Sequence, residues 1–163
     1  MRELKDFLEA IGAVYVPVGE RVNLNDRRFV VGLGVAAHIH ERGRLVYAGR
    51  LLGRTRGEFI PSASLLRELG RLQGPNKVWV DDRVGWLFTC GRDVFGESIL
   101  RSEGELVKGA CFLVMLGRDC LGYGRIGKWE GRMILRNIFD LGDFLRREWA
   151  TRMHPISIAD ERP

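Results

Sequence analysis

Long apolar runs are missing from this sequence. No stretch of the 163-residue chain approaches the roughly 18 apolar residues that a membrane-spanning helix needs. The opening segment, MRELKDFLEA, mixes charges into an amphipathic pattern and lacks the uninterrupted apolar stretch of a signal peptide. Hydrophobic residues still make up 45% of the chain, which is enough for a packed core. We therefore expect a soluble, intracellular protein with no membrane partner.

Metal-binding residues are also scarce. The three cysteines, Cys90, Cys111 and Cys120, form no C-x-x-C pair, which excludes a zinc finger and a secreted disulfide scaffold. Reduced, mostly buried thiols are the expectation, because free cysteine usually behaves as a small hydrophobic residue. His38 and His40 form H-x-H, but no third ligand lies at a suitable spacing. The sequence thus predicts no metal site.

No arrangement of residues typical of catalysis is present. There is no Ser/His/Asp or Cys/His order, and the adjacent Asp81 and Asp82 indicate a turn rather than a general acid/base pair. The glycine-bracketed loop 91–96 matches neither a Walker loop, since no G-K-[ST] follows, nor a dinucleotide fingerprint. We expect a protein that is not an enzyme and that has no cofactor.

Lysine is rare, and arginine supplies 22 of the 26 basic residues of a chain with a net charge of +5 and a pI near 9.5. The planar guanidinium suits bidentate phosphate contact, although genomic base composition or heat adaptation produces the same bias. Acidic residues nearly balance the second half of the chain. The local excess lies in residues 117–136, which hold Arg118, Arg125, Lys128, Arg132 and Arg136 against Asp119 and Glu130.

The first part of the chain is expected to form an antiparallel α+β domain over residues 1–74, with helices at both ends. Apolar residues at helical spacing predict helices at 3–11 and 62–72, and a short helix is favoured within 33–42. Short apolar runs bounded by turn residues predict strands at 13–18, 28–33, 44–48 and 50–54. Residues 73–76 (QGPN) are the best candidate for a linker.

A strand-rich second domain is expected over residues 76–150. Its predicted strands are 77–80, 107–116, 120–126 and 132–138, while 85–91 fits either a short buried helix or a strand. Asp140 is expected to cap a final helix that contains Leu141, Phe144 and Leu145. Residues 151–163 lack periodicity and are expected to form a flexible tail.

Two places in this second domain suggest contact with nucleic acid. On a strand over 132–138, Arg132 and Arg136 share one face about 13 Å apart, a separation that fits alternate phosphates of an extended single strand. A solvated outer face with two solubilising charges is the alternative. In the loop 91–96, Arg92 and backbone amides suit a phosphate, and Phe95 either stacks on a base or packs into the core.

The second half resembles a PUA domain. The resemblance rests on K-V-W-V (77–80), on WLFTCG, on the apolar strand with its L-G-x-G-like hairpin return, and on the terminal N-x-x-D-x-G-x-F-x-R-R. The version is most similar to that of the Nip-seven family, which acts in biogenesis of the large ribosomal subunit. The resemblance implies an α+β module followed by a C-terminal PUA-type β-pseudo-barrel. It also implies a non-catalytic RNA-binding protein that prefers uridine-rich single strands of large-subunit pre-rRNA and associates with other assembly proteins.

The same resemblance suggests where RNA would bind. Family contacts come from the last barrel strand before the terminal helix, which places them at Arg132 and Arg136, while two positions often basic in that pattern hold Met133 and Phe139. Arg118, Arg125, Lys128 and Arg92 complete the expected set. A protein–protein adaptor with weak RNA affinity is the alternative function. We expect a monomer, cytoplasmic in an archaeal cell and nucleolar in a eukaryotic one.

Overall fold

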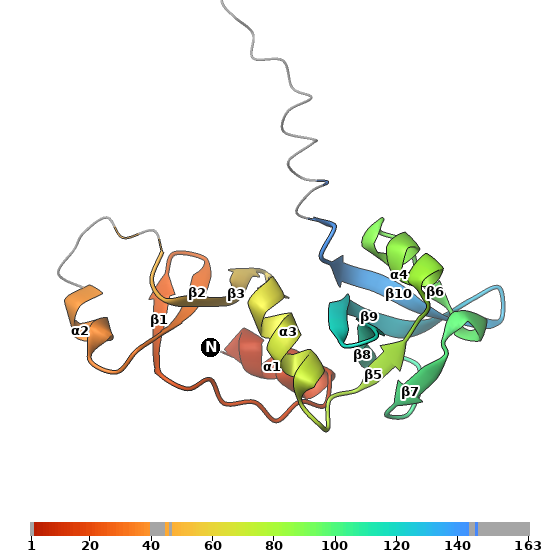
Figure 1. The fold of residues 1–163 in the computed structure, drawn as a ribbon, viewed down its shortest axis with the longest axis horizontal. Helices are drawn as coiled ribbons and strands as arrows, with labels where there is room; N and C mark the ends of the chain where they lie inside the picture. The colour runs from red at the N-terminus through yellow and green to blue at the C-terminus, as the bar shows by residue number, and fades with distance from the viewer. Residues whose placement is uncertain (1, 40–44, 46, 144–145, 147–163) are drawn as a thin grey trace, which may run out of the picture.

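The computed structural model describes residues 2–39, 45, 47–143 and 146, and within them the chain forms two sheets, one in each half of the sequence (Figure 1). Sheet A contains four antiparallel strands in the order β1-β2-β3-β4. These strands are β1 (Glu20–Leu24), β2 (Arg27–Val31), β3 (Arg50–Arg56) and β4 (Glu58–Pro61). The first half is therefore the α+β module that the sequence predicts.

Three helices accompany sheet A: α1 (Arg2–Ala10), α2 (Val35–Ile39) and α3 (Ala63–Arg71). The expected apolar stripes are present, since Leu4 and Phe7 of α1 and Leu65, Leu66 and Leu69 of α3 are all buried. Ser62 caps α3, because its hydroxyl accepts a hydrogen bond from the Leu65 amide at 3.1 Å. The predicted helices at both ends of this half are confirmed.

The strand predicted at 13–18 is wrong. This segment runs without a strand partner along the edge of the first half between α1 and β1 (Figure 1). Its side chains do alternate, with Pro17 buried and Val16 exposed, which explains the strand-like pattern. Side-chain contacts hold it instead: the Tyr15 hydroxyl donates to Glu68 of α3 at 2.5 Å and accepts from Arg50 of β3 at 3.0 Å.

Other expectations for the first half need adjustment. The described residues of the segment 44–48 form no strand, and the sheet continues instead from β2 to β3. The sequence prediction also missed β4, which follows β3 after a one-residue turn at Gly57. Gly57 has a φ of +77°, a conformation that favours glycine. A turn at Asn25, which has a φ of +54°, joins β1 to β2.

Sheet B contains six strands in the order β6-β10-β9-β8-β5-β7 and curls into the half-barrel of a PUA-type pseudo-barrel. Its neighbouring strands are antiparallel except for β5 and β8, which run parallel. The strands are β5 (Lys77–Trp79), β6 (Val94–Phe95), β7 (Arg101–Glu103), β8 (Cys111–Leu116), β9 (Asp119–Trp129) and β10 (Arg132–Asp140).

The segment that fitted either a helix or a strand forms a helix, α4 (Asp82–Thr89). The Asp81 carboxylate caps it by accepting from the Val84 backbone amide at 2.8 Å, so Asp81 begins the helix two residues after the end of β5. The buried Phe88 of α4 packs with apolar side chains of β5, β8, β9 and β10 on the inner face of sheet B. A short 3-10 turn, Gly96–Ser98, follows β6.

Two boundaries in the second half differ from expectation. Strand β8 begins at Cys111 rather than at 107, because Gly109 takes a φ of +92° and the chain turns there. Asp140 ends β10, and most of the helix expected to follow it lies outside the described residues, as does the expected tail at 151–163.

One hydrophobic cluster joins the two halves. The ring of Phe7 in α1 lies 5.5 Å from Phe59 of β4 and 5.1 Å, edge to face, from Tyr123 of β9. Helix α3 approaches sheet B so closely that a Cβ at Gly70 would lie 3.1 Å from both Met115 and Cys120. Helices α1 and α3 therefore cover part of the outer face of sheet B.

We expect Phe7→Ala to lower the free energy of unfolding by about 3–5 kcal/mol, because it removes a buried ring shared by both sheets. Urea denaturation followed by far-UV circular dichroism measures the loss. The wild type should unfold in a single transition that includes both halves. Independent unfolding of the two halves in the wild type would contradict the shared core.

The cysteines should differ sharply in reactivity. Cys90 is exposed, whereas Cys111 and Cys120 are buried, and desolvation raises the pKa of Cys120 to about 12, which disfavours its thiolate. Ellman's reagent at pH 8 should modify one thiol per native chain quickly and all three after denaturation. Rapid modification of two or three thiols in the native protein would refute the burial of this pair.

Candidate nucleic-acid interface

The outer face of the β9–β10 hairpin is only partly covered by the helices. Side chains of directly paired residues lie on the same face of an antiparallel sheet. Tyr123 of β9 is buried in the shared cluster, and three pairs continue this face beyond it. These pairs are Arg125 with Arg136, Gly127 with Ile134, and Trp129 with Arg132. The free part of the face thus carries three arginines and an aromatic ring.

Arg125 and Arg136 are exposed and stand directly opposite each other. Like charges in this position destabilise a sheet, with paired Cβ atoms about 4.5–5.5 Å apart. A side-chain interaction with Cys111 raises the pKa of Arg125, so this guanidinium stays charged at physiological pH. A phosphate between the two arginines would relieve their repulsion and accept hydrogen bonds from both.

A glycine shapes the site beside this pair. The Arg136 side chain lies across Gly127, where an added Cβ would come within 3.3 Å of its Nε atom. Gly127 therefore leaves room for the arginine to lie along the face rather than project into solvent. Ile134, which pairs with Gly127, is buried on this face and separates Arg132 from Arg136.

Aromatic side chains lie at the other end of the free face. Trp129 is 50% exposed and Phe95 is 38% exposed, and their ring centroids are 6.0 Å apart in an edge-to-face arrangement. Phe95 reaches this position because β6 pairs with β10. Of the two placements that the sequence allowed for Phe95, the structure shows the surface one. Arg132 forms an exposed ion pair with Glu97 at 3.6 Å, which contributes at most about 1 kcal/mol.

The structure places three of the six residues expected to contact RNA on one face. Arg132, Arg136 and Arg125 share the free face, and Arg92 lies in the loop next to its edge, where neighbouring Asp93 accepts a hydrogen bond from the Asn137 amide at 2.8 Å. Lys128 pairs with Met133 and points to the opposite side of the hairpin.

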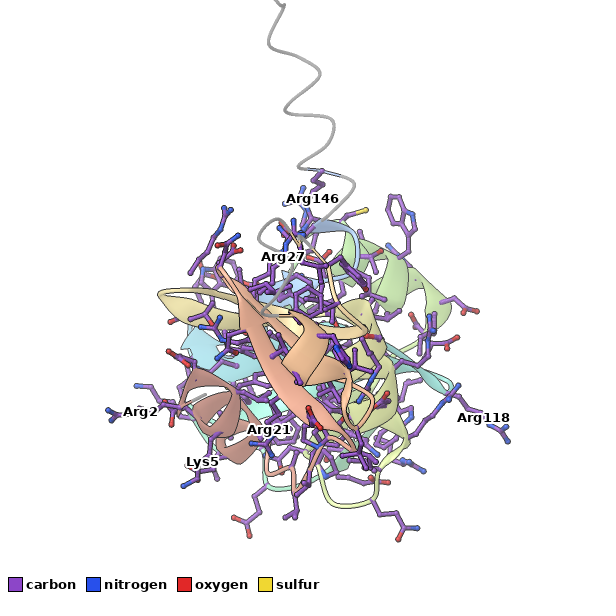
Figure 2. All side chains as sticks on the ribbon, turned by 90° about the vertical axis from the view of Figure 1, so that its left-hand side faces the viewer. Arg2, Lys5, Arg21, Arg27, Arg118 and Arg146 are labelled. Atoms are coloured by element: carbon purple, nitrogen blue, oxygen red, sulfur yellow. The ribbon has the colours of Figure 1, made fainter. Side chains whose placement is uncertain are left out.

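Arg118 is not part of this site. It lies in the turn between β8 and β9, about 20 Å along the strand from Arg125. Figure 2 shows Arg118 extending into solvent at the side of the molecule, away from Arg146, which follows the end of β10. Arg118 therefore lies apart from the arginines of the free face, and its position does not support the expected contact with the same stretch of RNA.

The two positions where the chain departs from the family's basic pattern have packing roles. Met133 packs against the inner core of sheet B, and a Cβ at Gly96 would lie 2.7 Å from its methyl carbon. The ring of Phe139 lies 6.5 Å from that of Tyr123, against the cluster that joins the halves. A basic residue at either place would put a charge beside apolar side chains.

The sequence prediction missed Trp129, Gly127 and Glu97. The alternation of β9 contained the signal for the first two, because Arg125, Gly127 and Trp129 are two residues apart and so share a face. Glu97 gave no such signal, because its ion pair with Arg132 depends on β6 lying beside β10.

The N-x-x-D-x-G motif fixes the end of β10. The side-chain amide nitrogen of Asn137 donates one hydrogen bond to the backbone carbonyl of Phe88 at 2.8 Å and another to the Asp140 carboxylate at 3.1 Å. Arg146 donates to both carboxylate oxygens of Asp140, which is 1% exposed, and to Thr89 O. A Cβ at Gly142 would lie 2.0 Å from that same carbonyl. The motif therefore ties β10 to the end of α4 and keeps Arg136, the residue before Asn137, in place.

A cleft of about 490 Å³ separates β4 from the end of β10. Arg56 and Arg146 line it together with Glu58, Asp140 and Asp143, so its charges are mixed. Among the residues that the structure describes, no group of three or more potential ligands could hold a metal ion. Within the same residues, no helix is long and apolar enough to cross a membrane.

The curled sheet with α4 on its inner face defines the C-terminal half as a PUA domain, and residues 76–149 match the family model of the UPF0113 PUA domain. The chain is 33% identical over 156 residues to a UPF0113 protein of Aeropyrum pernix, covering 90% of this chain and 87% of that protein. It therefore belongs to the UPF0113 family. It is also 31% identical over 81 residues to a UPF0113 protein of Archaeoglobus fulgidus, covering 45% of this chain and 47% of that protein.

We expect Asp140→Ala to lower the free energy of unfolding by about 1–3 kcal/mol, because Asn137 and Arg146 then lose their shared acceptor. Asp119→Ala, at the exposed first residue of β9, is the matched control and should change stability by less than about 0.5 kcal/mol. Thermal denaturation compares the two variants. Equal stability of both variants would show that the motif is not a structural clamp.

Proposed function

We propose that this protein binds single-stranded RNA on the free face of β9 and β10. The observation that carries the proposal is the direct pairing of Arg125 with Arg136, which places two exposed arginines side by side on one face, where one phosphate can accept hydrogen bonds from both. Membership of a PUA-domain family supports RNA as the anion. The role of this domain is to hold phosphates of an extended strand at a fixed spacing.

A role in biogenesis of the large ribosomal subunit is the more specific part of the proposal. Its support is the resemblance of WLFTCG and of the terminal N-x-x-D-x-G motif to the Nip-seven family. On this proposal the protein binds uridine-rich single strands of pre-rRNA, works with other assembly proteins, and acts as a monomer without a cofactor or catalysis. In an archaeal cell it would do so in the cytoplasm.

A protein–protein adaptor is the second candidate function, and a different surface favours it. Val14, Val16 and Val18 are 92%, 72% and 92% exposed, and Leu33 is 85% exposed. Alternate valines exposed along one segment present apolar side chains to solvent, and contiguous exposed apolar surface is typical of interaction sites. If the adaptor function dominates, assembly proteins should be recovered with this chain after nuclease treatment, and RNA affinity should be negligible.

The variant Arg125→Glu/Arg136→Glu should bind labelled hexauridine at least about tenfold more weakly, because two charge-assisted contacts are lost. The slope of log K against log salt should become shallower by about 1.4, the value for two phosphates of a single strand. Fluorescence anisotropy at several salt concentrations measures both quantities.

The control for this experiment is Arg71→Glu/Arg118→Glu, which makes the same change in net charge at exposed positions away from the face. It should retain most of the affinity and the wild-type salt slope. If both double variants lose affinity equally, net charge rather than this site governs binding. If the wild type binds no RNA even at low salt, the proposal fails.

A further inference from the structure

The arginine face carries a pair of aromatic side chains, from two different strands, that lie against each other and stay partly exposed. Phe29, Phe88 and Phe112 are fully buried, as the hydrophobic effect favours. Phe95 and Trp129 instead keep 38% and 50% of their surface in solvent, although they come from different strands and lie against each other. Such exposed, preorganised rings are suited to binding a flat ligand.

The geometry of the pair leaves ring faces open. The planes meet at 62°, so the contact is edge to face and covers only one of the four ring faces with the other ring. The backbones of both residues are held in the sheet, since Phe95 pairs with Ile134 and Trp129 pairs with Arg132. The buried side chain of Ile134 lies on the same face, between the two rings and the paired arginines.

Charges on the same face decide between two kinds of ligand. An apolar peptide or helix covering Trp129 would also bury Arg132, its direct neighbour in the ladder, with only the exposed Glu97 as a partner. A nucleotide presents a flat base to the rings and a phosphate to the guanidinium. It therefore satisfies both groups, and it is the ligand that this pairing of side chains fits.

The order of residues along β9 and β10 gives the arrangement of such a strand. Arg125 and Trp129 are four residues apart, about 13 Å along β9, and Arg136 and Arg132 repeat that spacing on β10. An extended strand along this face would place a phosphate between Arg125 and Arg136 at one end. It would place a base on the rings at the other end, beside Arg132.

We infer that Phe95 and Trp129 form a base-stacking site that holds one nucleobase of a single strand whose phosphates contact Arg132, Arg125 and Arg136. This inference rests on the proposed function, because it assigns the base contact within the same face. It adds that binding depends on the bases as well as on the backbone, with a dependence that stacking makes tolerant of base identity.

The experiment compares hexauridine with an abasic ribose-phosphate hexamer, both fluorescently labelled, by anisotropy. The wild type should prefer hexauridine by about five- to 150-fold, the factor that one stacked base supplies. In Trp129→Leu and Phe95→Leu this preference should fall toward one, while affinity for the abasic hexamer stays at the wild-type value. Trp129→Phe should restore most of the preference, because a ring returns.

Trp86→Leu is the matched control. Trp86 is 66% exposed on α4, and its replacement should leave the preference for hexauridine unchanged. Tryptophan fluorescence gives an independent readout: hexauridine should quench the wild type and Trp86→Leu, and the quenching should be lost in Trp129→Leu.

Each other result contradicts a distinct part of the account. A preference that survives in Trp129→Leu and Phe95→Leu overturns the stacking site and leaves RNA binding by the arginines intact. An equal loss of affinity for both hexamers in these variants also overturns it, because the rings would then only support the strands. Failure of the wild type to bind either hexamer overturns the proposed function itself, and the stacking site with it.

Discussion

The packing of α1 and α3 against the outer face of β8 and β9 is the contact on which the rest of the structure depends. It buries Phe7 against Tyr123 and brings α3 against Met115 and Cys120, so the two halves share one core. It also divides the outer face of sheet B. The covered part stabilises the protein, and the remaining part, along the ends of β9 and β10, stays free of the helices. Because β9 continues from one part to the other, the free face is joined directly to the shared core.

The free face places groups of different chemistry at fixed positions. Paired strands set Arg125 opposite Arg136 and Trp129 opposite Arg132, while the Asn137–Asp140–Arg146 hydrogen bonds hold the end of β10 on α4. Like charges opposite each other in a sheet are unfavourable, and on the proposed function a phosphate between the paired arginines would offset that cost. Such preorganisation would let an extended single strand bind with little reordering of the protein.

Local patterns predicted most of the fold, and they failed where a partner strand or a distant segment decides the outcome. The stripes of α1 and α3 and the alternation of β10 were readable because helices and strands have fixed periods. Residues 13–18 alternate like a strand, but strand formation needs a partner, and Tyr15 bonds to Glu68 instead. The same limit applies to the site. Spacing along one strand placed Arg132 and Arg136 on the same face. That Arg125, Trp129 and Phe95 share this face follows only from the pairing of β9 and β6 with β10. Proximity in sequence also said nothing of where Arg118 lies, which is the turn before β9, at the opposite end of that strand from Trp129.

The most direct test of the central claim observes the arginines themselves. Side-chain Nε–Hε NMR signals, assigned by single Arg→Lys substitutions, can be followed while hexauridine is added to the full chain. We predict that the signals of Arg125, Arg132 and Arg136 shift in a saturable manner, while those of Arg71 and Arg118 do not move. Saturable shifts confined to arginines outside the β9–β10 face, with these three unmoved, would contradict the account.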